Sequence, residues 1–232
     1  MYVQYHCAMT FTTLLSPLDT RVLGVLIEKQ HAVPDSYPLT LNYLLSGCNQ
    51  KTSRDPVMEV SEADLMASVE TLKRFSLLME SSGGRVMRYA HNAERVLQLP
   101  TQAVALLATL ALRGAQTAGE LRINSDRLHK FADISAVEGF LQELASRVPQ
   151  LAIELPRQPG SRENRWAHCL SGVPDVTALS PTTTPTVFGA EAISAGEVAV
   201  LRKELADLQA EVMVLKATVA ALCRELGVTP KG

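Results

Sequence analysis

The feature that most constrains the fold is a segment that occurs twice in the chain, at residues 61–91 and 133–168. Each copy starts with apolar positions at steps of four and three, and ends in two short apolar stretches separated by a polar turn. This order predicts a helix followed by a β-hairpin. The copies end almost letter for letter alike, RYAH against RWAH, and we expect the aromatic residues Tyr89 and Trp166 to pack in the core.

Further helices are expected before each copy. Ser16 suits the N-cap of the first helix and Pro17 its first turn, whereas Thr117 with Glu120 predicts a capping box in the second half. The expected helices are 17–30, 39–48 and 61–75, then 101–113, 117–123 and one that starts at Asp133 or Ser135. The expected strands are 77–80, 85–91, 151–155 and 165–170. Three helices followed by a two-stranded wing is the order of a winged helix, a variant of the helix-turn-helix.

The expected fold class is therefore mainly α with small β-hairpins (α+β), with two tandem winged-helix domains plus a C-terminal coiled-coil helix. The first domain spans 15–97 and the second 98–170, and a flexible linker rich in Ser, Thr and Pro spans 171–195 before the helix at 196–227. Residues 1–14 are expected to be a disordered extension or a wrongly assigned start, with Met9 as the alternative first residue.

The tail carries a heptad pattern that is typical of a coiled coil. Its apolar positions are Val198, Leu201, Leu205, Leu208, Val212, Leu215, Val219, Leu222 and Leu226. In a parallel pair Glu197 of one chain would face Arg202 of the other, whereas an antiparallel pair would bring glutamates together. We therefore expect a parallel homodimer; the alternative is a lone amphipathic helix that folds back on its own domains.

Composition argues against several classes of protein. Residues 1–170 hold 17 Lys and Arg against 17 Asp and Glu, so the basic surplus usual for a nucleic-acid binder is missing. The four cysteines show no metal-binding spacing, so no metal is expected. Without a membrane-spanning run or a signal peptide, we expect a cytoplasmic location and no membrane association. No glycine-rich phosphate loop, nucleophile motif or paired carboxylates occur, so no enzymatic activity, catalytic residue or cofactor is expected.

Duplex DNA is the first candidate partner, because most winged helices bind DNA. Side chains of Arg, Lys, Asn and Gln read bases in the major groove, but the outward face of the helix at 61–75 offers only one arginine among acidic residues. The polar loop at 49–56 is either a solvated connector or a phosphate contact. The candidate phosphate contacts are Lys51, Arg54, Arg74, Arg85, Arg88, Arg157, Arg162 and Arg165. Such contacts give affinity with little sequence choice.

Another protein is the second candidate partner. The outward faces of the two third helices carry small residues, which let another backbone approach closely: Ala63, Ala67, Gly139 and Ser146. Tandem winged helices also serve as adaptors, which is an analogy at the level of the fold. The alternative is that both faces are plain solvent-exposed surface.

Several passages together resemble the YceH family of bacterial proteins of unknown function. They are LSPLDTRVLGVLIEKQ (15–30) running on to NQKTSRDPVMEVSEADL (49–65), LRGAQTAGELR (112–122) and LPRQPGSRENRWAHCLSG (155–172). The resemblance implies a tandem winged-helix fold, a cytoplasmic location and no established activity, and it supplies no catalytic residue. The chain departs from the family pattern at Ala118, where the family has proline. Dimerisation is inferred from the heptads of this chain alone.

Overall fold

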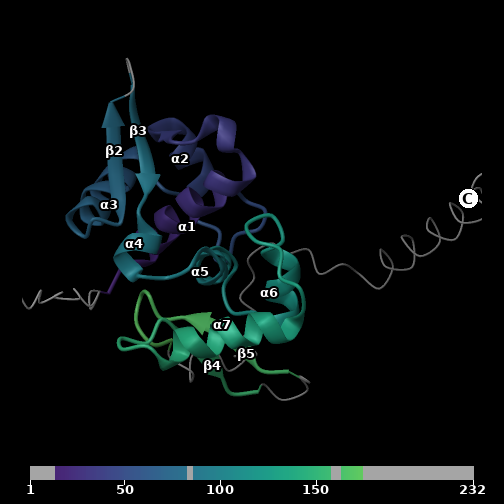
Figure 1. Ribbon diagram of the computed structural model, residues 1–232. Helices are drawn as coiled ribbons and strands as arrows, with labels where there is room; N and C mark the ends of the chain where they lie inside the picture. Colours follow the sequence, from purple (N-terminus) through teal and green to yellow (C-terminus); the bar gives the residue numbers. More distant parts are fainter. Residues whose placement is uncertain (1–13, 83–85, 158–162, 175–232) are drawn as a thin grey trace, which may run out of the picture. The chain divides into compact units, whose positions relative to one another are not determined.

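The computed structural model describes residues 14–82, 86–157 and 163–174 (Figure 1). The first part of this chain forms α1 (Pro17–Ala32), the 3-10 helix η1 (Pro34–Ser36), β1 (Leu39–Thr40), α2 (Leu41–Cys48), α3 (Glu62–Arg74), β2 (Leu78–Ser82) and β3 (Met87–His91). The second part forms α4 (Ala93–Leu97), α5 (Thr101–Arg113), α6 (Ala118–Asn124), α7 (Ile134–Ser146), β4 (Ala152–Leu155) and β5 (Arg165–His168). The predicted mixture of helices and small antiparallel hairpins is confirmed.

Local signals at the helix ends explain why the boundaries match the prediction closely. Ser16 accepts a hydrogen bond from the Asp19 backbone in a capping box at the start of α1, and Ser61 caps α3. Asp133, one of the two expected caps, caps α7. At the end of α5, Gly114 adopts a backbone φ of 72°, which residues with a Cβ rarely adopt. These signals act within a few residues, so the sequence alone suffices to find them.

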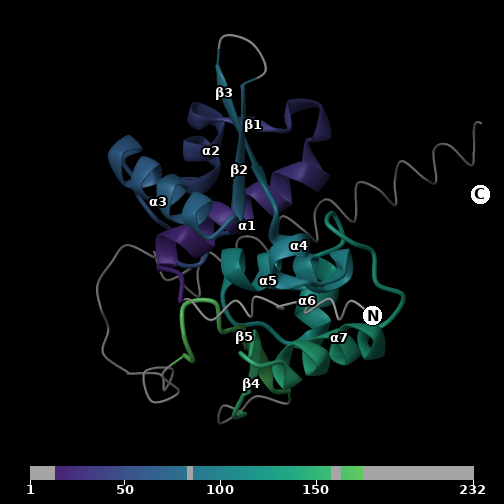
Figure 2. The ribbon, with the colours of Figure 1, turned by 60° about the vertical axis from the view of Figure 1, so that its left-hand side comes forward.

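Each half pairs its last strand in the same way. β2 and β3 form an antiparallel hairpin, and β1 adds to it so that Leu39 lies opposite Tyr89. β4 and β5 form the second hairpin, and Gln116 forms an isolated bridge with Trp166. Tyr89 and Trp166 thus hold equivalent positions, and both are buried as expected. Figure 2 shows β2 and β3 extending beyond the helices of the first half.

The core is built around two buried helices, α1 and α5, which lie side by side in both views (Figures 1 and 2). Buried residues of both halves belong to one continuous cluster. The helices approach closely at Gly24, where an added Cβ would lie 3.0 Å from Leu112 Cγ. The Leu15 amide also donates to the Leu170 carbonyl at 2.8 Å, which ties the start of the first half to the end of the second. All described residues lie in one compact unit.

Three elements were not foreseen: η1, β1 and α4. The helix α4 is too short to show an apolar period, and β1 is a two-residue strand that depends on its pairing with β3. Residues 57–60 lie outside any helix or strand. Val60 exchanges two hydrogen bonds with the side chain of Asn49. The predicted coiled coil at 196–227 lies outside the described residues.

Candidate functional site: the joining loop and the hollows beside it

Residues 49–60, here called the joining loop, connect α2 to α3 and contact the second half of the chain. The backbone amide of Asp55 donates to the Leu112 carbonyl at 2.8 Å. From α5, Arg113 Nη2 donates to Ser53 Oγ at 2.9 Å. The loop is therefore bonded to α5 through Ser53 and Asp55, although other residues of it, including Lys51, are exposed.

Arg54 anchors the joining loop from the inside. Its side chain has no exposed surface, and its Nη1 and Nη2 atoms donate to the two carboxylate oxygens of Glu28 at 3.2 and 2.6 Å. Nε donates to the Gly47 carbonyl at 3.3 Å and Nη1 to the Ser53 carbonyl at 2.9 Å. The expectation that Arg54 contacts phosphate is wrong, because its donors bond to internal acceptors and the side chain does not reach the surface.

A second arginine, Arg21, lies fully buried in α1 beneath the same loop. Nη2 donates to the Pro56 carbonyl at 2.6 Å, while Nε and Nη1 have no hydrogen-bond partner among the described residues. Burial, followed by the like charge of Arg54, lowers the pKa of Arg21. Burial also raises the pKa of the nearby Cys48 thiol to about 12, so this cysteine is neutral. Cys48 is therefore no reactive thiolate at neutral pH.

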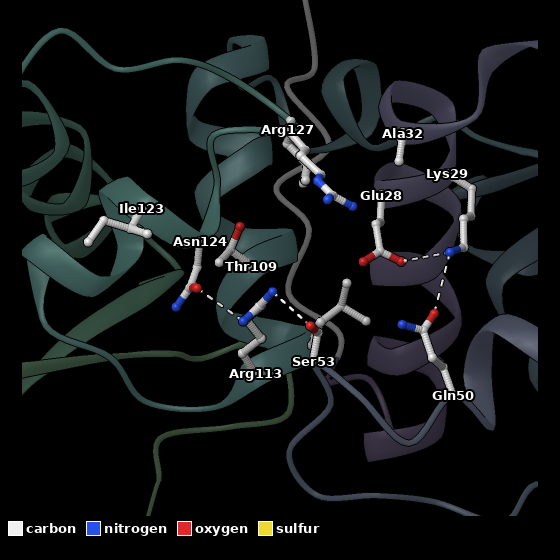
Figure 3. Close-up of a pocket in the computed structure, with 12 residues that line it drawn as sticks. Glu28, Lys29, Ala32, Gln50, Ser53, Thr109, Arg113, Ile123, Asn124 and Arg127 are labelled. Atoms are coloured by element: carbon white, nitrogen blue, oxygen red, sulfur yellow. Dashed lines mark hydrogen bonds and ion pairs between the residues drawn. The ribbon is translucent and has the colours of Figure 1, made fainter. Parts of the chain in front are cut away.

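A polar cleft of about 290 Å³ lies beside the joining loop (Figure 3). One wall comes from α1, with Glu28 and Lys29. The facing wall comes from α5 and α6, with Arg113 and Asn124. Figure 3 shows the guanidinium of Arg127, from the turn after α6, directed across the cleft toward α1.

Positive charge dominates this cleft. Arg113 donates to Asn124 Oδ1 at 3.0 Å and to Ser53 Oγ, which are neutral acceptors that leave its charge uncompensated. Burial opposes ionisation of Glu28, but the hydrogen bond and charge of Arg54 outweigh it and lower the pKa of this carboxyl. Glu28 is therefore ionised and already paired with Arg54, which leaves Lys29, Arg113 and Arg127 in excess.

The sequence did not point to this cleft. Its cations come from two helices and a turn. Lys29 and Arg113 lie in passages that carry the family resemblance, but nothing in the sequence marks them as neighbours in space. A further signal is the run LRINSDRLHK at 121–130, which includes Arg127 and holds three Lys or Arg residues against one acidic residue.

A second hollow, here called the α3 groove, has a volume of about 570 Å³ and lies between the start of α1, the end of the joining loop and α3. Its apolar lining comes from Leu18, Met58 and Val60. The exposed acids Glu59 and Asp64 border it. Apolar side chains with an acidic border suit a partner that is itself apolar and basic.

Of the small residues predicted to face a protein partner, only Ala67 lines the α3 groove. Ala63 is exposed on the same helix, and Gly139 and Ser146 are exposed on α7. A Cβ added at Gly139 would meet nothing within 4 Å, so that face is open.

The remaining predicted phosphate contacts are scattered. Lys51, Arg74 and Arg157 are exposed, whereas Arg88 is half-buried and donates to the Pro38 carbonyl at 2.8 Å. Arg165 pairs with a carboxylate of α6 at 2.6 Å. Arg85 and Arg162 lie outside the described residues.

The strand-end histidines are structural. His91 bonds to Gln30 through Nε2, and its Nδ1 accepts from the Ala93 amide. His168 Nδ1 has no hydrogen-bond partner within the described part of the chain. Burial lowers the pKa of both rings to about 4, so both are neutral at pH 7.

The described ranges contain no cluster of three or more His, Cys, Asp or Glu side chains that could hold a metal ion. Within the same ranges, no helix has both the length and the apolar character needed to cross a bilayer.

Comparison with known proteins places these features in a family. The family described as "Protein of unknown function, DUF480" matches residues 15–161. The chain belongs to this family. The match spans both halves and the joining loop, and it confirms the expectation of an uncharacterised bacterial family on the YceH pattern.

Relatives of this chain match over nearly their whole length. It is 53% identical over 219 residues to a UPF0502 protein of Leptothrix cholodnii, and the aligned residues make up 92% of this chain and 96% of the relative. It is 54% identical over 215 residues to a UPF0502 protein of Methylibium petroleiphilum, with 93% and 91% covered. A UPF0502 protein of Burkholderia pseudomallei is 55% identical over 216 residues, with 92% and 90% covered. The names of these relatives state no activity.

Proposed function

We propose that this DUF480 protein is a tandem winged-helix adaptor without enzymatic activity that works in the cytoplasm and binds another protein through the α3 groove. The observation that carries the proposal is the groove itself, which is lined in part by Leu18, Met58 and Val60 and bordered by the exposed carboxylates of Glu59 and Asp64. The partner segment is one with an apolar face flanked by Lys or Arg, because those charges complement the border.

The order of elements supports the winged-helix assignment. Apart from the short η1 and α4, three helices precede a hairpin in each half: α1–α3 and α5–α7. The residues before α2 and before α6 pair with the last strand of their half. A winged helix that binds DNA places its third helix in the major groove. Here α3 begins with Glu62 and Asp64, which repel a phosphate backbone. The same helix is better suited to a basic protein segment.

The test is a selection of displayed random peptides on the full-length chain, followed by affinity measurements on the selected peptides. Selected sequences should combine apolar residues with Lys or Arg. Ala67→Arg should weaken their binding by at least about tenfold, because it fills the groove and places like charges together. Ala63→Arg is the matched control, since Ala63 is exposed on the same helix outside the groove lining. Equal binding by both variants, or selection of acidic peptides, would refute the proposal.

Duplex DNA is the second candidate partner, and the exposure of Lys51, Arg74 and Arg157 favours it. A titration on mixed-sequence duplex at two salt concentrations tests it. If the chain contacts phosphates, its association constant for DNA should fall as the salt concentration rises. A plot of the logarithm of this constant against the logarithm of salt concentration should have a slope of about −0.9 for each contact. Absence of binding at low salt rejects this candidate.

The adaptor is further proposed to be a parallel homodimer through the heptads at 197–226, which lie outside the described residues. Light scattering of the full chain at micromolar concentration should give the mass of a dimer. Leu208→Lys, which puts a charge in the apolar seam, should give a monomer. A monomeric unmodified chain would contradict this part of the proposal.

A further inference from the structure

We propose that the polar cleft between α1 and α5–α6 is a binding site for a small phosphate-bearing anion. This site is separate from the α3 groove and does not depend on the adaptor proposal. Its cations are Lys29 of α1, Arg113 of α5 and Arg127 of the turn after α6. They converge from three segments on one hollow, as Figure 3 shows.

The charge of the cleft selects an anion. Its only lining carboxylate, Glu28, is bonded through both oxygens to Arg54, whose own side chain is wholly buried. The positive charge of Arg54 therefore largely cancels the negative charge that Glu28 would otherwise contribute to the cleft. Lys29 lies 3.4 Å from Glu28, but it competes there with Arg54 at 2.6 Å. The cations of the cleft therefore exceed its anions.

The donors also suit a phosphate group. Arg113 is fixed in direction by Asn124 and Ser53, both neutral, and a guanidinium has further N–H groups to donate. An arginine held in this way is preorganised for bidentate contact with an oxyanion. The Ser53 hydroxyl, also on the wall, accepts from Arg113 and has its own O–H to donate.

Size limits the ligand class. A cleft of about 290 Å³ lies at the lower end of the range for small-molecule sites. It suits pyrophosphate, a sugar phosphate or a mononucleotide rather than a large cofactor. Because one wall belongs to the first half and the facing wall to the second, a bound anion would bridge the two halves and stabilise their association.

The test is calorimetric titration of the full chain with inorganic pyrophosphate at constant ionic strength. The unmodified chain should show saturable binding with one site per chain. Arg127→Gln should weaken the affinity roughly tenfold or more, the effect of losing one charge-assisted hydrogen bond. Arg127 is exposed, so this change leaves the core intact.

Arg122→Gln is the matched control. Arg122 is exposed on α6, close in sequence to Arg127, but it does not line the cleft. Its variant should bind pyrophosphate within about twofold of the unmodified chain, since screened charge alone contributes little. If both variants weaken pyrophosphate binding equally, the anion is attracted by general positive charge and not by a defined site, and the proposal is overturned. The absence of saturable pyrophosphate binding to the unmodified chain would overturn it as well.

A parallel titration with mixed-sequence duplex DNA separates the two sources of phosphate. Binding of pyrophosphate that depends on Arg127 supports a small ligand, whether or not duplex binds elsewhere. Arg127-dependent binding of duplex without binding of pyrophosphate would overturn the small-ligand assignment. The cleft cations would then serve a nucleic-acid backbone.

Discussion

Replacement of Arg54 by methionine tests whether the joining loop is held by its buried ion pair. Methionine keeps an apolar stem of similar length but removes every donor. The change leaves Glu28 with Lys29 as its remaining cation at 3.4 Å, and it deprives the Gly47 and Ser53 carbonyls of a donor. The loop should then loosen from α1 and, through its bonds to Leu112 and Arg113, from α5.

The expected magnitude follows from burial. Removing one partner of a buried ion pair costs about 3–5 kcal/mol. The Arg54 side chain is wholly buried, but that of Glu28 is 18% exposed, so water can rehydrate the carboxylate that remains. We therefore expect a loss at the lower end of this range, so that Arg54→Met lowers the free energy of unfolding by about 3 kcal/mol. For a chain of this size that lowers Tm by roughly 6–12 °C.

The assay is urea unfolding of the full chain, followed by circular dichroism at several pH values. The pKa of Glu28 lies below its ordinary 4.5 in the folded protein, because Arg54 outweighs the effect of burial. A carboxyl whose pKa is depressed by folding stabilises the protein above its unfolded pKa and loses that contribution as pH falls through the folded value. The stability gap between the unmodified chain and Arg54→Met should therefore narrow below pH 4.5.

Two further variants complete the test. Arg74→Met removes an exposed arginine of α3 and should change the free energy of unfolding by less than about 0.5 kcal/mol. Arg54→Met combined with Glu28→Leu should recover much of the loss, since an apolar pair replaces an unpaired charge. A loss below about 1 kcal/mol for Arg54→Met, or no recovery in the double variant, would refute the assigned role of the pair.

Three other predictions concern the framework. Gly47→Ala should destabilise the fold by about 1–3 kcal/mol in urea unfolding, because the new Cβ would lie 2.6 Å from Val25 Cγ1; an unchanged midpoint would contradict this packing. Thr117→Ala removes the capping box of α6 and should cost about 1 kcal/mol, whereas Thr117→Ser should cost less. Burial is the main reason that the pKa of His91 is lowered to about 4 in the folded protein. In the unfolded chain this histidine gains a proton as pH drops below 6.5, whereas the folded chain does not until about pH 4. The free energy of unfolding should therefore fall as pH drops from 6.5 toward 4. His91→Gln should flatten that decline, and an unaltered pH profile would argue against a buried neutral ring.

The local architecture was predictable because its causes are local. Ser16, Ser61 and Thr117 each satisfy backbone amides within three residues, and the apolar periods of α3 and α7 repeat within one helix. The repeated hairpin ends at Tyr89 and Trp166 identify equivalent strands from the sequence alone. By contrast, β1 and α4 are too short to carry a period, so their formation depends on tertiary contacts.

By itself, the sequence determined the two helix–hairpin copies, their helix caps and their buried stripes, because those features arise from backbone geometry and apolar spacing. Only the tertiary structure decided what the charged residues do. Arg54 and Lys51 stand in the same polar loop, yet one is buried against Glu28 and the other is exposed. The cations of the cleft come together only when α1 packs on α5. Charge acts through distance and burial, and both are set by packing between residues that are remote along the chain.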